Sequence, residues 1–394
     1  MASDHTSEDA AVLGIGIVGW GWMGQVHARA YARLRQHYPD APLRPNLVAV
    51  ADTATDDRLV VAIDTFGFRD AHSDWRDLIA RDDIDAVSVT GPNFIHRDVA
   101  VAAAEAGKHL WVEKPAGRNA AETRAIWNAV RASGVQSAAG FNYRNVPAVE
   151  LARQLIADGR LGRINHVLIR LLADYAAHPE GALTWRFKTE WSGSGILGDL
   201  ASHGVDLGRY VVGEITDLIC DDATFITQRP EASGAASHFS RATGGPMGAV
   251  ENEDYVAALL RFAGGARGIL ESSRASVGEQ CTYGIEVHGE RGALSWDFRR
   301  MGELQLCVDQ DYQNASFVTR YVAPGDGEFG RFQPASGIAM GYDDLKTVEA
   351  YRLVQSIAIG KPQGATVEDA LTAAEIIDAM AESASSRRWV SLRN

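Results

Sequence analysis

A glycine-rich turn between a buried strand and a helix constrains this chain more than any other feature. Residues 12–18 form a nearly continuous apolar run, which is typical of a strand buried on both faces. The turn Gly19-Trp20-Gly21-Trp22-Met23-Gly24 follows, and apolar residues at spacings of three and four then predict a helix. In this context, backbone N–H groups and a helix N-terminus would face a pyrophosphate. We therefore expect a dinucleotide site that includes Gly19, Gly21, Trp22, Met23 and Gly24; the alternative is a tight turn with only a structural role.

The pattern G-x-G-x-x-G alone is weak evidence, because this chain is rich in glycine. It also occurs at 14–19, 193–198 and 325–330. None of those three copies connects a buried strand to a periodic helix, so only the copy at 19–24 predicts a nucleotide site.

Composition narrows the class of protein. A chain of 394 residues predicts about two domains, and 46% hydrophobic with 23% charged residues is typical of a soluble globular protein. The 38 Lys and Arg against 51 Asp and Glu argue against binding to nucleic acid or to an anionic membrane. Three distant cysteines (Cys220, Cys281 and Cys307) exclude a disulfide framework. The N-terminus does not resemble a signal peptide, and no apolar run is long enough to span a membrane, so we expect a cytoplasmic protein.

The order of strands and helices changes near Gly140. Before it, apolar runs at 47–51, 84–89, 109–112 and 136–139 alternate with helices, which predicts a doubly wound parallel sheet. After it, runs at 164–172, 255–262, 266–273, 283–288 and 293–298 include two hairpins at Gly264-Gly265 and Gly289–Gly292. Helices are expected at 148–157, 198–212 and 343–385, and a long loop at 228–250. The sequence thus predicts an α/β protein with a Rossmann domain over 12–140 and a second α/β domain over 141–394.

Asp52 is the candidate for the adenosine ribose. It ends the second apolar run, and Pro39, Pro42 and Pro45 explain its long separation from Gly24 by an extended loop. A carboxylate at that position would repel a 2′-phosphate, so NAD is favoured over NADP. The alternative is a solvated aspartate at a strand end.

Two groups of residues are candidates for proton chemistry. Lys114 follows the strand 109–112, and the carboxyl ends of parallel strands border the ligand crevice. Asp199 and His203 have i, i+4 spacing at the margin of a buried helix stripe, and imidazole suits proton abstraction near neutral pH. Alternatively, Lys114 is a surface residue, and the charge of Asp199 favours a helix N-terminus. His203 would then be a histidine at the edge of the core whose hydrogen bonds are satisfied.

Two other chemistries find little support. Asp199, His203, Glu113 and His96 offer metal-ligand atoms, but no spacing matches a zinc site, so we expect no metal. A Ser-His-Asp hydrolase is disfavoured because the chain has no G-x-S-x-G motif.

The motifs together resemble the Gfo/Idh/MocA family of sugar and cyclitol oxidoreductases from about Leu13 to Leu392. The resemblance rests on 19–24, Asp52, Thr90-Gly91-Pro92-Asn93 with His96, Glu113-Lys114-Pro115, 140–144, Trp185-Arg186, and Ser194-Gly195 leading into Asp199, His203 and Asp206. Gly91 departs from the pattern, because many members have no residue between Thr and Pro-Asn. The family implies a second domain built on a large, open, mostly antiparallel sheet, whose exposed face commonly forms a homo-oligomer (dimer or tetramer).

The resemblance also implies roles for particular residues. Lys114, His203 and Asp199 would be catalytic, with Lys114 also orienting the nicotinamide. Thr90, Asn93, His96, Glu113, Trp185 and Arg186 would contact the cofactor. Asn142, Tyr143, Arg144 and Trp185 would line the substrate site with the catalytic residues.

The implied activity is NAD-dependent oxidation of a secondary hydroxyl of a pyranoside, an anhydro-sugar such as levoglucosan, or a cyclitol. Residues 185–188, the loop near 230–250 and Gly341-Tyr342 are similar to the branch of the family that contains the levoglucosan dehydrogenases, which oxidise the 3-hydroxyl of an anhydro-sugar. A keto-sugar reductase, an enzyme that uses NAD in glycoside cleavage and a non-catalytic NAD-binding sensor remain alternatives.

Overall fold

The computed structural model describes residues 11–54, 57–231, 240–242 and 245–392. The chain divides into two compact units. The first comprises residues up to Gly117, Ala121–Asn142 and Met340–Leu371, and the second comprises Arg118–Ala120, Tyr143–Ala339 and Thr372 onward. The expected boundary at residue 140 is close to the change of unit at Asn142, but the segment 340–371 returns to the first unit.

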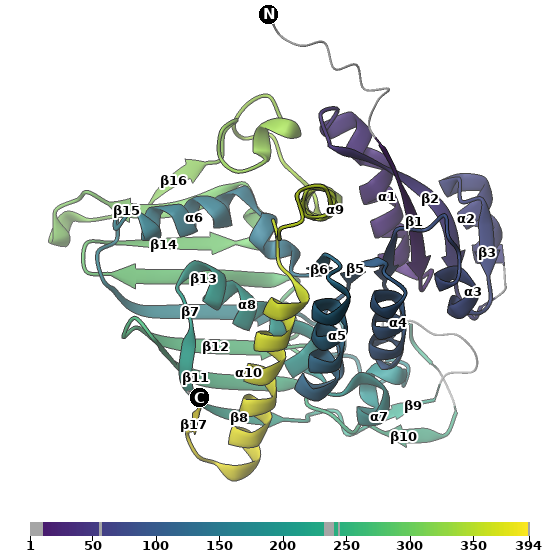
Figure 1. The fold of residues 1–394 in the computed structure, drawn as a ribbon. Coiled ribbons are helices and arrows are strands. Elements are labelled where there is room, and N and C mark those ends of the chain that lie inside the picture. The colour runs from purple at the N-terminus through teal and green to yellow at the C-terminus, as the bar shows by residue number, and fades with distance from the viewer. Residues whose placement is uncertain (1–10, 55–56, 232–239, 243–244, 393–394) are drawn as a thin grey trace, which may run out of the picture. The chain divides into compact units, whose positions relative to one another are not determined.

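A parallel sheet of six strands forms the centre of the first unit, in the order β3-β2-β1-β4-β5-β6 (Figure 1). This is the doubly wound Rossmann order, as the alternation of strands and helices predicts. The strands are β1 (Ala11–Val18), β2 (Leu43–Ala51), β3 (Asp70–His72), β4 (Ala86–Val89), β5 (His109–Val112) and β6 (Ser137–Ala139). The helices are α1 (Trp22–His37), α2 (Asp57–Phe66), α3 (Trp75–Ile79), α4 (Asn93–Glu105), α5 (Ala120–Ser133) and α9 (Tyr342–Ile359). Because α9 packs along α1, a segment from near the C-terminus completes this unit.

A nine-stranded sheet forms the centre of the second unit, in the order β16-β15-β14-β13-β7-β12-β11-β8-β17. Its strands are β7 (Ile164–Leu172), β8 (Ile215–Ala223), β11 (Tyr255–Phe262), β12 (Arg267–Ser273), β13 (Thr282–Gly289), β14 (Gly292–Asp297), β15 (Glu303–Val308), β16 (Val318–Tyr321) and β17 (Val390–Ser391). Among the described strand pairs of this sheet, only β7 and β12 are parallel, so the expectation of a mostly antiparallel sheet is confirmed.

One face of this sheet is covered and the other is exposed. The helices α6 (Pro147–Ala157) and α8 (Ser202–Val211) pack on it, and residues alternate between buried and exposed along β11 and β12. Leu259 and Ile269 are directly opposite each other on neighbouring strands and are 49% and 45% exposed. The sheet therefore presents apolar side chains on its open face.

Four local expectations need correction or extension. The segment 57–79 contains α2, β3 and α3, which the sequence analysis did not identify. The expected loop 228–250 contains two short paired strands, β9 (Gln228–Pro230) and β10 (Met247–Ala249), and its residues 232–239 and 243–244 lie outside the described chain. The expected helix 343–385 is two helices, α9 and α10 (Val367–Ser386), because Gly360 has a left-handed φ of 69° and Pro362 follows it. The helix expected at 198–212 begins with a π-helical turn, Leu197–Ala201, before α8.

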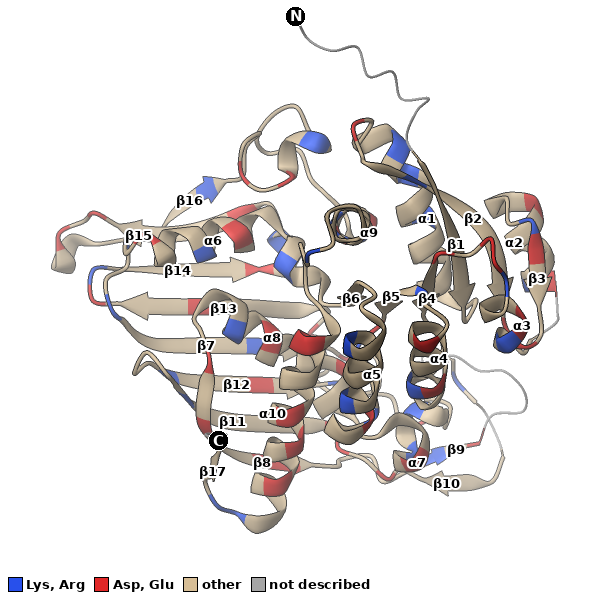
Figure 2. Cartoon of the chain, viewed as in Figure 1, with Lys and Arg blue, Asp and Glu red and all other residues tan. Residues whose placement is uncertain are grey.

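Charge and hydropathy agree with the composition. Across the described residues, Lys and Arg are interspersed with Asp and Glu on the helices and strand ends of each unit (Figure 2). None of the helices in the described chain has the length and apolar character needed to cross a membrane.

Candidate active site

The glycine turn at 19–24 has the geometry that a dinucleotide requires. Gly19 has a φ of 96°, and a Cβ on it would lie 2.4 Å from the backbone nitrogen of Gly91, so only glycine fits this turn. A Cβ on Gly24 would lie 2.1 Å from the carbonyl oxygen of Gly19. Because glycine has no Cβ, α1 can begin close to β1. A Cβ on Gly21 would meet no atom within 4 Å. The backbone at Gly21 is therefore open at the N-terminus of α1, where a pyrophosphate would approach.

Side chains from neighbouring strands support this turn. The Thr90 hydroxyl, after β4, donates to the carbonyl oxygens of Gly19 (2.7 Å) or Val18 (3.1 Å). The Asp52 carboxylate, after β2, accepts the backbone N–H of Trp20 at 2.6 Å and of Ala54 at 2.9 Å. Asp52 is thus fixed beside the turn, and its contact with the adenosine ribose stays a prediction.

Replacement of Asp52 is expected to change cofactor preference. Asp52→Ala should weaken NAD binding and raise the NADP-to-NAD ratio of kcat/KM about 10–100-fold, because a hydrogen bond to a charged group is worth about 1.5–3 kcal/mol. Asp52→Asn serves as the control that keeps an acceptor for Trp20 but removes the charge, and it should relax the preference with less loss of stability. An unchanged ratio in both variants would refute the placement of Asp52 at the ribose.

The loop that carries Lys114 is held on both sides. Before it, the Glu113 carboxylate is buried, and its Oε1 accepts from His27 Nε2 at 3.0 Å and from Lys346 Nζ. After it, the carbonyl of Pro115 contacts Nδ1 of His96 at 2.9 Å, while Nε2 of His96 contacts the Gly91 carbonyl at 2.8 Å. Glu113 and His96 are therefore anchors of the loop within the first unit, and their direct contact with cofactor stays a prediction.

Burial sets the charge state of His27. Its ring is fully buried and stacks on Trp111 with centroids 3.5 Å apart. Loss of hydration lowers its pKa to about 4, against the smaller opposing effect of its hydrogen bond to Glu113.

This shift predicts a stability change with pH. Between pH 6.5 and 4, His27 binds a proton in the unfolded chain but stays neutral in the folded chain. Acidification over this range therefore destabilises the fold. The pKa difference corresponds to about 3 kcal/mol when integrated over that window. Denaturant unfolding measures the loss of free energy of unfolding between pH 7 and pH 4.5. This loss should be smaller in His27→Gln than in the wild type, because glutamine keeps a donor for Glu113 but does not titrate. Equal pH slopes in the two proteins would contradict this assignment.

In the second unit, Asp199 is held by two polar side chains. The Tyr175 hydroxyl donates to Oδ2 of Asp199 at 2.5 Å, and a guanidinium nitrogen of Arg186 lies 3.9 Å from Oδ1. Burial and the nearby Asp199 charge raise the pKa of Tyr175 well above its usual value, so the phenol stays a donor. Asp199 keeps a side-chain exposure of 23%, which leaves part of its carboxylate accessible to a ligand.

The π-helical turn that presents Asp199 depends on Glu253. Its buried carboxylate oxygen Oε1 accepts the backbone N–H groups of Gly195 at 2.8 Å and Leu197 at 2.9 Å, and its carbonyl accepts that of Ile196 at 3.0 Å. A Cβ on Gly195 would lie 2.2 Å from that carbonyl, so glycine is required there. The sequence predicted that Asp199 and His203 lie on one face of a single α-helix. In the structure, Asp199 lies in the wider π-helical turn and His203 lies in α8.

His203 lies in an aromatic surrounding. It is buried, with an exposure of 6%, and its ring centroid is 4.7 Å from that of Tyr143. Tyr143 also contacts Phe298 at 5.2 Å and Tyr283 at 5.9 Å between centroids. The imidazole is therefore packed within this aromatic cluster.

Other expected site residues have clear positions. Arg144 forms a bidentate ion pair with buried Asp206, with Nε 2.8 Å from Oδ2, and so fixes α8. Trp185 is half-buried, and the Arg186 guanidinium lies 4.5 Å from its ring centroid. Asn142, at the end of the first unit, is 1% exposed, and its Nδ2 has no hydrogen-bond partner among the described residues. A buried amide donor of this kind is costly unless a ligand or a water molecule accepts its hydrogen bond.

Three supporting residues were missed by the sequence analysis. Tyr175 follows strand β7, so its place beyond a strand end was an available signal. Glu253 and Lys346 are far in sequence from the groups they hold, and no local pattern identifies them.

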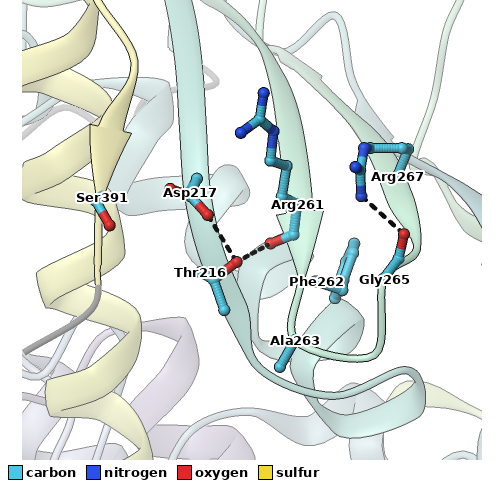
Figure 3. A pocket seen from close by; sticks show the side chains of 8 residues that line it. All are labelled: Thr216, Asp217, Arg261, Phe262, Ala263, Gly265, Arg267 and Ser391. Atoms are coloured by element: carbon cyan, nitrogen blue, oxygen red, sulfur yellow. Dashed lines mark hydrogen bonds between the residues drawn. The ribbon is translucent and has the colours of Figure 1, made fainter.

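A depression of about 430 Å³ lies elsewhere in the second unit, between β8, β11, β12 and β17 (Figure 3). It is lined by Thr216, Asp217, Arg261, Phe262, Ala263, Gly265, Arg267 and Ser391, all different from the expected site residues. Thr216 Oγ1 bonds to Asp217 Oδ2 at 2.9 Å, and Arg267 donates to the Gly265 carbonyl at 2.7 Å. The lining of this depression therefore contains no residue of the candidate active site.

Comparison with known proteins agrees with the geometry. Residues 13–141 match the model of the oxidoreductase family with an NAD-binding Rossmann fold, and residues 149–295 match the GFO/IDH/MocA C-terminal domain. The chain belongs to the Gfo/Idh/MocA oxidoreductase family. Its first unit is an NAD-binding Rossmann domain, and the protein is an NAD-dependent oxidoreductase.

Individual members of this family are similar over most of their length. Levoglucosan dehydrogenase of Pseudarthrobacter phenanthrenivorans is 36% identical over 96% of this chain and 97% of its own. Inositol 2-dehydrogenase of Rhizobium meliloti is 29% identical over 80% of this chain and 86% of its own. A solved structure of levoglucosan dehydrogenase in complex with NADH and levoglucosan has a TM-score of 0.90 at 34% identity, with 97% of this chain and 100% of that chain covered.

Proposed function

We propose that this protein oxidises a secondary hydroxyl of a sugar with NAD, and that an anhydro-pyranose such as levoglucosan is its substrate. We propose the 3-hydroxyl as the group oxidised, as the resemblance to the levoglucosan dehydrogenase branch implies. The observation that carries the proposal is the partly exposed carboxylate of Asp199, which Tyr175 and Arg186 hold. Four residues further along the chain, His203 packs beside Tyr143. The similarity to levoglucosan dehydrogenase over nearly the whole chain supports the choice of sugar.

The second unit offers the contacts that a sugar needs. Partly exposed Asp199, beside Arg186, can accept a hydrogen bond from a hydroxyl. The indole of Trp185 can pack on the apolar face of a pyranose ring. Tyr175 keeps Asp199 oriented while it does so.

Oxidation of a secondary alcohol removes a proton from oxygen and a hydride from carbon. NAD, when bound, supplies the nicotinamide carbon that accepts the hydride. We assign proton removal to the imidazole of His203, which packs beside Tyr143. Lys114 donates a hydrogen bond to the oxygen as negative charge develops on it, an interaction that is strongest in the transition state.

Assembly and location belong to the same proposal. The open face of the nine-stranded sheet, with Leu259 and Ile269 half-exposed, is a suitable surface for a homo-oligomer, and we propose a dimer or tetramer. We also propose that the enzyme works in the cytoplasm, in agreement with its unpaired cysteines.

Absorbance at 340 nm tests the substrate directly. Purified protein with NAD should produce NADH faster with levoglucosan than with other pyranosides or inositols. With NADP in place of NAD, the rate of oxidation of levoglucosan should be lower. If NADH forms with an inositol but with no sugar, the substrate is a cyclitol and the proposed sugar is wrong. Consumption of NADH with a keto-sugar, with no oxidation of any alcohol, would favour the reductase. NAD binding without any turnover would favour the sensor.

A further inference from the structure

A buried cluster of charges lies behind the loop that carries Lys114. The ammonium of Lys346, on α9, is 0% exposed and contacts Oε1 of Glu113 and, at 2.9 Å, Oε2 of Glu349. His27 Nε2, on α1, also contacts Oε1 of Glu113, at 3.0 Å. Ions removed from water in this way make a poor source of stability, because the loss of hydration offsets their attraction.

The position of Glu113 gives this cluster a second consequence. Glu113 directly precedes Lys114, and its other oxygen, Oε2, lies 3.3 Å from the backbone nitrogen of Lys114. Gly140 closes the remaining side, because a Cβ there would lie 2.6 Å from the same oxygen. The carboxylate is thus in contact with α1, α9, the end of β6 and the Lys114 backbone, and it has little freedom to rotate.

We propose that Lys346 is a positioning residue for Lys114. By holding the Glu113 carboxylate in place, Lys346 fixes the backbone from which the Lys114 side chain extends. On the other side of Lys114, Nδ1 of His96 lies 2.9 Å from the carbonyl oxygen of Pro115. The helix α9, which the chain adds to the first unit only after residue 340, therefore completes the loop that carries the catalytic lysine.

The charge state of Glu113 supports this assignment. Burial acts to raise the pKa of Glu113, but Lys346 and His27 outweigh burial and hold that pKa below its usual range. An ionised carboxylate has only acceptor atoms, so it can hold Lys346 and the Lys114 N–H together. Without the ammonium, burial would favour protonation of Glu113, and one of its oxygens would become a donor.

Burial and the Glu113 charge also raise the pKa of the neighbouring Glu349, to about 7, although Lys346 opposes this. Glu349 therefore takes up a proton more readily than Glu113 does, and Glu113 keeps the charge that holds Lys346 beside the loop.

The inference rests on the proposed role of Lys114, and its test has one measurement that does not depend on activity. Lys346→Met removes the ammonium at similar length, and Lys361→Met makes the same change at an exposed lysine beyond α9. Hydrogen–deuterium exchange should become faster in Lys346→Met at the peptide spanning Glu113 to Gly117, and Lys361→Met should match the wild type. Unchanged exchange of that peptide overturns the proposal.

Kinetics provide the second measurement. In Lys346→Met, kcat with levoglucosan should fall about 10–100-fold while the Kd for NAD changes less than threefold, as expected when a displaced side chain loses its geometry. A C3-deuterated substrate should show a larger isotope effect on kcat, because the chemical step becomes slower. A lower melting temperature with unchanged kcat and isotope effect would make Lys346 only structural and would overturn the proposal. If Lys346→Met does not fold, Glu113→Gln, which keeps the shape but loses the charge, must show the same exchange and kinetic changes.

Failure of the proposed function has a different signature. If the wild type oxidises no sugar, the kinetic measurement has no reference, while the exchange measurement still decides whether Lys346 fixes the loop.

Discussion

Lys114→Ala should lower kcat about 100–1,000-fold while the protein still binds NAD, because one donor to a developing oxyanion contributes this much. The effect is expected in kcat, since the hydrogen bond strengthens as charge forms on the sugar oxygen. NAD affinity should persist because the glycine turn and Asp52 are left unchanged. Initial rates at 340 nm and a fluorescence titration with NAD measure the two quantities.

Lys108→Ala is the matched control for this prediction. Lys108 precedes β5 and Lys114 follows it, so the two lysines lie at opposite ends of one strand. The Lys108 ammonium donates to the Arg81 carbonyl at 2.9 Å, outside the proposed machinery, and its loss should leave kcat within twofold. Equal effects of the two substitutions would sink the assigned role of Lys114.

His203→Asn should lower kcat about 100–10,000-fold, the range that general acid–base catalysis contributes. A base must be deprotonated to act, so the wild-type rate should fall at acidic pH, and the variant should lose this dependence. Asparagine has no ring nitrogen that can accept a proton, so the variant tests the imidazole that packs beside Tyr143. The kcat–pH profile with saturating NAD and sugar measures both expectations.

His37→Asn, at the end of α1, makes the same change far along the chain and should leave the profile intact. If His203→Asn keeps both the wild-type kcat and its decrease at acidic pH, another group must remove the proton from the substrate.

The Rossmann unit could be predicted from the sequence because each of its signals is local. The buried strand, the glycine turn and the helix at 11–37 are consecutive, and a strand–helix alternation leaves few possible sheets. The hairpin of β11 and β12 was equally clear, with Gly264-Gly265 between two apolar runs. Short elements such as β3, with three residues, carry too little pattern to be identified.

The sequence provides the candidate residues of the site, but the contacts that hold them in the structure were less predictable. The motifs identified Lys114, Asp199 and His203 as candidates, since each stands next to a recognisable strand end or helix. The π-helical turn at Asp199 was not predictable, because it depends on Glu253, 56 residues from Leu197. Likewise Lys346 lies 233 residues from Glu113, and only the folding of α9 onto the first unit brings them together.

Transfer of deuterium from sugar to cofactor tests the central claim most directly. Levoglucosan labelled with deuterium at C3 is incubated with the enzyme and NAD, and the reduced cofactor is examined by mass spectrometry. The account predicts NADH one mass unit heavier than that formed from unlabelled sugar, together with a 3-keto product. Unlabelled NADH, or no NADH at all, would contradict it.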